Sequence, residues 1–385
     1  MDVVMTPDLP VATPEVAIAT LSQDAGRKGR KDRVRVVDFD WRWKEGVQAL
    51  YAQTFGEAAA AAFASRWQWS RSTDLGQDSA PAWVLSHGQA AVGFLATVPL
   101  PYRIAGERVI AHTPCDYAVL PGYRFNGILL MRRFFEVCEN CVSCDDIPAT
   151  IKVTEWLGAR RAGRMVRVVK ILDARSLRTR RGWNRVPSPA LWPLTASILL
   201  ADRVRVLQAP GGGGASPAAG FDCHFDRFFQ RLARTVPATV ERSLAFLRWR
   251  YGAASPHAGA EVGVITSSDG ELRGYIVFHC SPTVSHASCI LDLQTDPPGD
   301  GGLTGALLDY AVDRLRAKGA WVVRYHFVPS AYAPPLSLLH ARGFVTRGGH
   351  QMLVRFEDTD LQATAAAQAN WSYSYGDSEA SHAEI

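Results

Sequence analysis

Two carboxylates stand alone in apolar stretches of this sequence, and a lone buried carboxylate can act as a general base. Asp116 lies in the stretch from Cys115 to Leu120, and Asp292 lies in the stretch from Ile290 to Leu293. Burial disfavours the charged carboxylate, which makes it a stronger base near neutral pH. Both positions also suit an alternative, in which the carboxylate ends a strand and accepts hydrogen bonds from backbone amides. Asp116 ranks first as a base because a loop of the phosphate-binding type follows it.

The segment after Asp116 has the residue types that a phosphate site requires. It runs as Tyr117-Ala-Val-Leu-Pro-Gly-Tyr-Arg-Phe-Asn-Gly-Ile-Leu-Leu130, from a strand through a turn with Pro and Gly into an apolar helix. Backbone N–H groups of such a turn can point at a pyrophosphate, and the helix N-terminus adds partial positive charge. In the alternative, this is an ordinary strand–turn–helix in which Pro and Gly only end the elements.

This segment resembles the acyl-CoA signature of the GNAT acetyltransferase superfamily, a strand ending in Val-x-Pro followed by Tyr-Arg-x-x-Gly-x-Gly/Ala and an apolar helix. The resemblance implies acyl-CoA as the donor substrate. The main chain of Val119 and Leu120 would then bind the pantetheine arm. Leu129 departs from the signature, which has a small residue there. The pyrophosphate would be held by the loop and the first residues of the helix, namely Arg124, Phe125, Asn126, Gly127 and Ile128.

The same resemblance implies amine acylation, which needs proton transfer. An alkylammonium with a pKa near ~10.4 must lose a proton before its nitrogen attacks a thioester. Many members of the superfamily use a carboxylate as base and a Tyr near the end of the last helix as acid. That Tyr position is Thr154 in this sequence, and Leu339 in the later copy described next. Other groups must therefore serve, and after Asp116 the candidates are Glu155 as a base and Tyr123 as an acid.

The order of signals around Asp116 recurs about 180 positions later, which predicts two copies of one domain. An aromatic element, first at Trp67–Trp69 and then at Trp249–Tyr251, precedes a Gly turn, a strand with one acid and a Pro/Gly-rich loop that opens a helix. We expect each copy to have its own core because the unit is domain-sized. The second loop, Pro298–Ala306, lacks the leading Arg, so the first copy is the expected cofactor binder.

The elements of each copy follow in the order strand, helix, strands, helix, strand, helix and strand, which indicates an α+β fold. With the resemblance, we expect two tandem GNAT-like domains, each a mixed, largely antiparallel twisted sheet flanked by helices. Turns between strands are expected at His87-Gly88 and at Ala105-Gly106-Glu107, and residues 127–141 are expected to form one helix. The predicted divisions are a disordered lead (1–32), an N-terminal domain (33–181), a linker with a Gly-rich loop (182–220), a C-terminal domain (221–358) and a disordered tail (359–385).

The composition indicates a soluble protein. The 385 residues are 47% hydrophobic and 21% charged, and we find neither a secretory signal nor the run of about 18 apolar residues that a membrane span needs. Seven cysteines, an odd number, indicate reduced thiols and a cytoplasmic location. Cys138 and Cys141 fall on the expected helix, where we interpret them as small apolar residues, and with Cys144 they are not expected to bind a metal.

Basic residues gather in one part of the sequence. Between Arg160 and Arg185 there are nine arginines and one lysine against the single acid Asp173. This stretch is either a solvated rim or a surface for an acidic partner such as an acyl carrier protein. No nucleic-acid-binding motif accompanies it, so nucleic acid is not an expected partner. A monomer is expected, because two fused copies can form the pseudo-dimer that single-domain relatives make by association.

The predicted function is an N-acyltransferase that moves an acyl group from acyl-CoA, or from an acyl carrier protein, to a primary amine of a small molecule, sugar or peptide. The Trp-x-Trp and Leu-Arg-Trp-Arg-Tyr elements also resemble GNAT-like proteins of bacterial cell-envelope polysaccharide loci. Two alternatives stay open. One is a Fem-type aminoacyl- or acyl-transferase, which also pairs two such domains. The other is a non-catalytic acyl-CoA-binding or scaffold protein.

Overall fold

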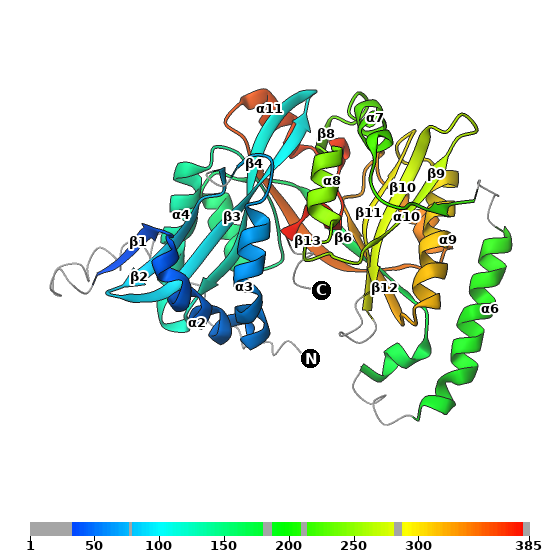
Figure 1. The fold of residues 1–385 in the computed structure, drawn as a ribbon, viewed down its shortest axis with the longest axis horizontal. Coiled ribbons are helices and arrows are strands. Elements are labelled where there is room, and N and C mark those ends of the chain that lie inside the picture. The colour runs from blue at the N-terminus through cyan, green and yellow to red at the C-terminus, as the bar shows by residue number, and fades with distance from the viewer. Residues whose placement is uncertain (1–32, 77–78, 180–186, 209–213, 281–286, 380–385) are drawn as a thin grey trace.

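The computed structural model describes residues 33–76, 79–179, 187–208, 214–280 and 287–379, and Figure 1 shows their arrangement. The lead predicted over residues 1–32 lies outside the described residues. Two halves stand side by side, the first over residues 33–179 and the second over residues 223–355, and the C-terminal segment lies between them.

In the first half, helices cover both faces of the strands. Helices α2 and α3 pack on one face with Val84, Phe94 and Ala96, and α4 packs on the other face with Trp83 and Leu85. Its elements are β1 (Val34–Asp38), α2 (Lys44–Phe55), α3 (Glu57–Ser70), β2 (Ala82–His87), β3 (Ala90–Ile104), β4 (Glu107–Val119), η4 (Pro121–Asn126), α4 (Gly127–Val137), β5 (Cys141–Asp145), α5 (Pro148–Trp156) and β6 (Arg160–Ile171).

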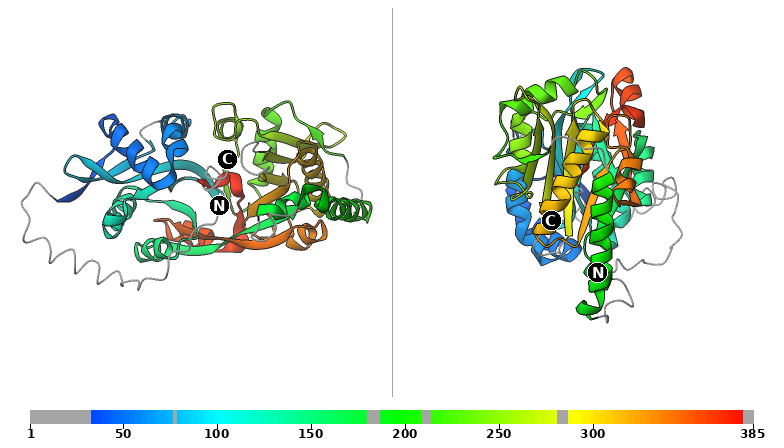
Figure 2. Two further views of the ribbon diagram at one scale, coloured as in Figure 1. Left: turned by 90° about the horizontal axis from the view of Figure 1, so that it is seen from below. Right: turned by 90° about the vertical axis from the view of Figure 1, so that its right-hand side faces the viewer.

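The second half has the same plan, with α9 and α10 on one face and α7 and α8 on the other. Its elements are α7 (Cys223–Leu232), β8 (Ala238–Val240), α8 (Leu244–Tyr251), β9 (Glu261–Thr266), β10 (Leu272–Cys280), β11 (Ala287–Thr295), α9 (Gly301–Ala317), β12 (Val322–Phe327), α10 (Leu336–Ala341) and β13 (Val345–Arg355). Between the halves come η5 (Ala174–Thr179), η6 (Ser188–Leu191), α6 (Trp192–Gln208) and β7 (Ser216–Pro217). Helix α6 lies at the outer edge of the second half (Figures 1 and 2).

All described strands belong to one sheet. Its two ends are built alike, because the strands of each half follow one another in chain order from the edge towards the centre. The order is β1-β2-β3-β4-β5-β13-β6-β12-β11-β10-β9-β7. The closing strands are exchanged, since β13 of the second half pairs with β5, and β6 of the first half pairs with β12. The expectation that each copy has its own core is met only in part: some buried clusters lie mainly within one half, but one cluster combines Leu100 and Val142 of the first half with Phe225 and Leu247 of the second.

The predicted turns of the first half are confirmed, and one predicted helix is wrong. Strands β2 and β3 form a hairpin at Gly88, where φ is +62°, and β3 and β4 turn at Ala105 and Gly106, both with positive φ. The helix expected over residues 127–141 ends at Val137, and residues 141–145 form β5 instead. Residues 141–145 form a strand because they pair with β13, which lies more than two hundred residues later in the chain. A local sequence pattern does not reveal such a distant partner.

The aromatic elements of the repeat meet at the junction of the halves. The rings of Trp69 on α3 and Trp249 on α8 stack with centroids 4.7 Å apart and planes 2° apart. Each indole N–H donates to the backbone carbonyl of the other Trp, at 3.0 Å in both directions. This reciprocal contact joins α3 to α8 and follows the 180-residue offset of the sequence repeat.

The tail predicted as disordered over residues 359–385 is ordered over residues 359–379. It forms α11 (Thr359–Ala366), η7 (Gln368–Asn370), β14 (Trp371–Ser372) and η8 (Tyr375–Asp377). Trp371, Tyr373 and Tyr375 are each at most 2% exposed. Burial of three aromatic side chains offsets the loss of chain entropy that would otherwise leave an Ala- and Ser-rich segment disordered. Among the described residues, no helix is both long enough and apolar enough to span a membrane.

Candidate active site

The candidate site lies where β4 parts from β5 in the first half. Within the described residues, these neighbouring parallel strands share one ladder pair, His112 with Cys141. The Thr113 hydroxyl then donates to the Val142 carbonyl at 2.7 Å. Beyond this point the strands diverge, although β4 continues to Val119 along β3. The diverging edge of β4 therefore presents backbone groups that an extended ligand could pair with, as an added strand would.

Asp116 sits at a bulge in this diverging part of β4. The register of the β3–β4 pair shifts between Phe94 and Ala96, and Asp116 has φ +56°. A bulge of this kind redirects one side chain out of the strand alternation. The Asp116 carboxylate is 30% exposed and lies 3.7 Å from the Arg66 guanidinium.

The buried hydroxyl of Tyr51 completes this group of side chains. Burial raises the pKa of Tyr51, and the nearby charge of Asp116 raises it further. The hydroxyl lies beside the Asp116 carboxylate, and among the described residues two nitrogens of Arg66 are buried without a hydrogen-bond partner. Asp116, Arg66 and Tyr51 therefore form a polar cluster that a polar ligand could complete.

The predicted phosphate loop follows β4 directly. Residues Pro121–Asn126 form the short helix η4, and α4 begins at Gly127. The side chains of Arg124 and Phe125 are exposed, Phe125 by 70%. A Cβ at position 127 would overlap the Tyr117 hydroxyl. A glycine fits at position 127 because the Tyr117 hydroxyl occupies the place of a side chain, which lets the N-terminus of α4 lie close to the end of β4.

The other two predicted site residues are hydrogen-bonded to side chains outside this cluster. Tyr123, on η4, shares a 2.7 Å hydrogen bond with Nδ1 of His87 on β2. Glu155, near the end of α5, accepts two hydrogen bonds from the Arg161 guanidinium, at 2.6 and 3.2 Å. The structure thus brings Asp116 together with Arg66 and Tyr51, whereas Glu155 belongs to an ion pair near the surface.

Asp292 has the same place in the second half as Asp116 in the first. Gly93 pairs with Val119, Gly274 pairs with Thr295, and each Asp lies three residues before the strand partner of its Gly. The environments differ, because Asp292 is completely buried. Its oxygens accept hydrogen bonds from four side chains at 2.7–3.0 Å, namely those of Arg242, Tyr275, Gln294 and Ser374.

The C-terminal segment fills the space between β11 and β12. In the first half, the corresponding space lies between β4 and β5. Ser374 forms a bridge with Phe327 of β12, and a Cβ on Gly376 would come within 2.9 Å of the Leu291 carbonyl of β11. The buried guanidinium of Arg242 binds both Asp292 and Asp377 of this segment. Removing one member of such a buried cluster leaves an uncompensated charge. In this setting Asp292 anchors the tail.

Glu379 is a site residue that the sequence predictions missed. Burial raises its pKa to about 8, against the effects of a backbone hydrogen bond and of Arg250, while Asp116 adds to the rise. Its carboxylate also raises the pKa of Cys115 on β4 and of Cys144 on β5, beyond the larger effect of burial. Glu379 therefore lies near these two strands. The alternation of Trp371, Tyr373 and Tyr375 was the sequence signal for a buried segment leading to it.

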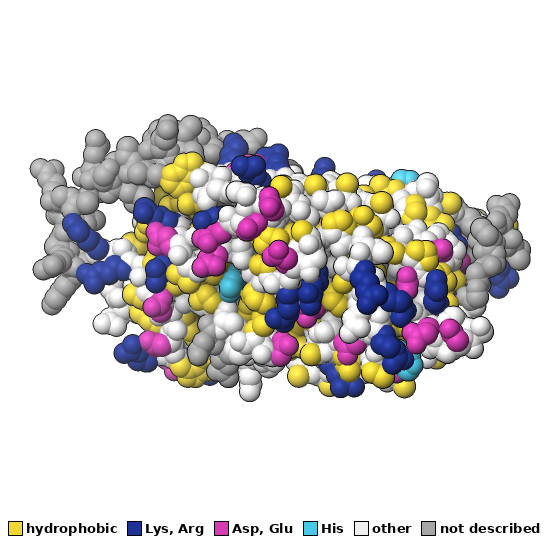
Figure 3. Space-filling model, turned by 90° about the horizontal axis from the view of Figure 1, so that it is seen from above, with side chains coloured by type: hydrophobic (Ala, Val, Ile, Leu, Met, Phe, Trp, Pro, Cys, Tyr) yellow, Lys and Arg dark blue, Asp and Glu magenta, His cyan; other side chains and the backbone are white. Residues whose placement is uncertain are grey.

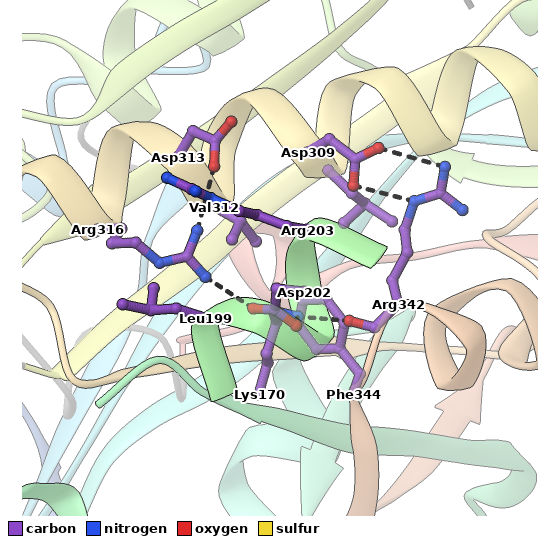
Figure 4. A pocket seen from close by; sticks show the side chains of 11 residues that line it. Lys170, Leu199, Asp202, Arg203, Asp309, Val312, Asp313, Arg316, Arg342 and Phe344 are labelled. Atoms are coloured by element: carbon purple, nitrogen blue, oxygen red, sulfur yellow. Dashed lines mark hydrogen bonds and ion pairs between the residues drawn. The ribbon is translucent and has the colours of Figure 1, made fainter. Parts of the chain in front are cut away.

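A separate cavity of about 490 Å³ lies between α6, α9 and the end of β6 (Figure 4). Most of its charged side chains are paired with one another: Asp202 accepts from Lys170 and from Arg316, both at 2.7 Å, and Asp309 accepts from Arg342 at 3.1 Å. A Cβ on Gly305 would overlap the Arg342 guanidinium. Arg342 thus lies against the first turns of α9, which follow the second Gly-rich loop.

The basic stretch from Arg160 to Arg185 does not form one free surface. Lys170 is buried in an ion pair with Asp202, and Arg175 pairs with Asp173 at 2.6 Å. Residues 180–186 lie outside the described residues. On the face seen from above, basic and acidic side chains are interspersed (Figure 3).

The three neighbouring cysteines are not on one helix. Cys138 ends α4, and Cys141 and Cys144 lie on β5. In the part of the chain that the structure describes, no group of three or more His, Cys, Asp or Glu side chains is arranged to hold a metal ion.

The sequence matches no protein-family model and no curated protein, but the fold matches solved structures. N-myristoyltransferase of Saccharomyces cerevisiae with bound myristoyl-CoA has a TM-score of 0.56 at 12% identity, covering 93% of this chain and 90% of that chain. A GCN5-related N-acetyltransferase from Anabaena variabilis has a TM-score of 0.55 at 15% identity, covering 85% and 73%. A probable N-acyltransferase from Enterococcus faecalis has a TM-score of 0.54 at 10% identity, covering 84% and 73%. At such identities the similarity is one of fold alone, and the chain shares its fold with these three structures.

Proposed function

We propose that this protein is an N-acyltransferase that moves an acyl group from acyl-CoA to a primary amine of a small molecule, sugar or peptide. The observation that carries the proposal is the parting of β4 from β5 after His112 and Cys141, next to a loop with the residue types of the acyl-CoA signature. A solved structure with a similar fold contains myristoyl-CoA.

We place the donor in the first half of a pair of GNAT-like halves. The equivalent gap of the second half is filled by Ser374 and Gly376, and Arg342 lies against Gly305 at its helix. In the first half, backbone groups of Val119 and Leu120 would pair with the pantetheine arm. The pyrophosphate would lie against the loop and the start of α4, at Arg124, Phe125, Asn126, Gly127 and Ile128.

The reaction would take place at the bulge of β4. The acceptor ammonium would bind the exposed carboxylate of Asp116, lose a proton, and attack the thioester carbonyl carbon. The C–S bond then breaks, and the thiolate takes up the second proton lost by the nitrogen. Tyr123 is the proposed acid, positioned by its hydrogen bond to His87. Glu155 is a weaker candidate, since Arg161 holds its carboxylate.

The remaining sequence predictions stay proposals. A cytoplasmic location, a monomeric state and a link to cell-envelope polysaccharide loci rest on the sequence alone. A carrier-protein donor is less favoured than acyl-CoA because Lys170 and Arg175 of the basic stretch pair within the chain.

Calorimetric titration with coenzyme A, acetyl-CoA and a long-chain acyl-CoA tests the donor site. We expect Arg124→Glu to weaken binding at least tenfold, because it places a negative charge at the pyrophosphate. The matched control is Arg132→Glu, since Arg132 is an exposed residue of α4 that pairs with Glu136. Equal binding by both variants would exclude this loop and direct attention to the loop from Pro298 to Gly305. No binding by the wild type would favour a carrier-protein donor or a scaffold role.

A further inference from the structure

We propose that Glu379, carried into the site by the C-terminal segment, is the general base of the acyl transfer. This inference rests on the proposed function and assigns the step that removes the proton from the acceptor. Under it, Asp116 binds the acceptor ammonium and Glu379 receives the proton.

The segment before Glu379 is fixed on both sides, which gives its carboxylate a defined position. The side chain of Arg250, only 1% exposed, donates from Nε to the Gly376 carbonyl at 2.5 Å and from Nη2 to the Ser378 carbonyl at 2.7 Å. Asp377 is bound by Arg242, and it also accepts a hydrogen bond from the backbone N–H of Ser374 at 2.8 Å. A carboxylate that follows directly on such anchors is positioned as a catalytic group must be.

Arg250 in turn is held by the junction of the halves. Its guanidinium lies 5.6 Å from the ring centroid of Trp69 and 5.8 Å from that of Trp249. The stacked Trp pair, Arg250 and the C-terminal segment therefore form one chain of contacts that ends at Glu379.

The groups near this carboxylate surround the gap in which we place the thioester. The groups in electrostatic contact with it come from four elements around the gap between β4 and β5 and from the tail itself. They are Tyr102 on β3, Cys115 and Asp116 on β4, Cys141 and Cys144 on β5, Arg250 on α8, and Tyr373 of the tail.

The acid–base character of Glu379 suits proton removal near neutral pH. Its pKa of about 8, raised chiefly by burial, makes it a stronger base than an ordinary carboxylate and keeps it deprotonated in part at pH 7–8. One ammonium proton passes to Glu379 before attack and is later released to water. The second leaves the nitrogen as the C–S bond breaks and ends on the coenzyme A sulfur, so the products are the amide and free coenzyme A.

The division of roles predicts different kinetic effects for the two carboxylates. Glu379→Gln is expected to lower kcat by about 10²–10⁴, leave acyl-CoA binding and the acceptor KM unchanged, and remove the rise in rate that the wild type shows with pH around 8. The rate rises with pH because only deprotonated Glu379 accepts a proton. Asp116→Asn is expected to raise the acceptor KM and keep that rise. Glu357→Gln, an exposed acid near the start of the C-terminal segment, is the matched control with wild-type kinetics.

A titration that needs no acceptor tests the same assignment. In protein with ¹³C-labelled glutamate carboxyls, one signal that titrates near pH 8 is expected in the wild type and in Glu357→Gln, and is expected to be absent from Glu379→Gln. The proposal is overturned if Glu379→Gln keeps the wild-type kcat and pH profile, if Asp116→Asn alone abolishes the pH-dependent rise, or if Glu379 titrates as an ordinary glutamate. Failure of acyl-CoA binding in the wild type is a separate result, which sinks the proposed function.

Discussion

Gly127 shows how one residue sets the approach of α4 to the end of β4. Because a Cβ at this position would overlap the Tyr117 hydroxyl, any larger residue must displace a buried aromatic side chain. Burial raises the pKa of Tyr117 to about 12, which reflects how closely its hydroxyl is enclosed. We expect a bulky substitution at this position to disturb packing as well as ligand binding, so Arg124 is the better position for locating the cofactor.

We expect Gly127→Ala to lower the free energy of unfolding by about 1–3 kcal/mol through overpacking. Tyr117→Phe removes the atom that the new Cβ meets, so the double variant should recover much of this loss. Urea unfolding of the wild type, both single variants and the double variant measures the coupling. Additive effects of the two substitutions would show that the Tyr117 hydroxyl does not determine the residue at 127.

At the scale of elements, the contact between α3 and α8 depends on two tryptophans that each complete the other's hydrogen bonds. Loss of either ring leaves its partner with an unstacked face and leaves the partner's backbone carbonyl without its indole donor. We expect Trp69→Leu and Trp249→Leu each to destabilise the protein by about 2–4 kcal/mol. The double variant should cost less than the sum by about 1 kcal/mol or more.

A double-mutant cycle with chemical unfolding measures this coupling. The control pairs Trp249→Leu with Trp83→Leu, because Trp83 packs under α4 in a different buried cluster, and this pair should be additive. If the coupling energy of the Trp69–Trp249 pair equalled that of the control pair, the stacked contact would add nothing to stability beyond the burial of each ring.

The sequence predicted elements well where local pattern decides them. The hairpins at Gly88 and Ala105–Gly106 follow from turn residues, and α4 follows from the apolar spacing after Gly127. It failed at β5, since residues 141–145 become a strand only by pairing with β13. It failed again at the tail, because an Ala- and Ser-rich composition does not reveal that Trp371 is buried against another part of the chain.

The same limit applies to the candidate site. Asp116 could be selected because it lies next to a recognisable loop in the sequence. Asp292 has an equal place in its strand, yet its role is set by Arg242 and Ser374, which the sequence places 50 and 82 residues away. Glu379 could not be selected, since its surroundings exist only after both halves and the tail have packed.

At the scale of the whole molecule, exchange of β6 and β13 makes the halves depend on each other. Each half completes its sheet with a strand of the other, and β8 adds a further pairing with β3. We expect a single cooperative unfolding transition, with far-UV circular dichroism and Trp fluorescence changing together. Residues 33–179 expressed alone should not fold, because β5 and β6 would keep unpaired edges. Two separate transitions, or a stable isolated half, would contradict this dependence.

The exchanged strands also have a consequence for synthesis on the ribosome. The edge of β5 stays without its partner until β13 has left the exit tunnel, after roughly 200 further residues. At about 5–20 residues per second this takes on the order of 10–40 s. During that time the nascent first half presents an open strand edge to other chains, so this protein is expected to depend on chaperones at the ribosome more than a single domain of similar size would.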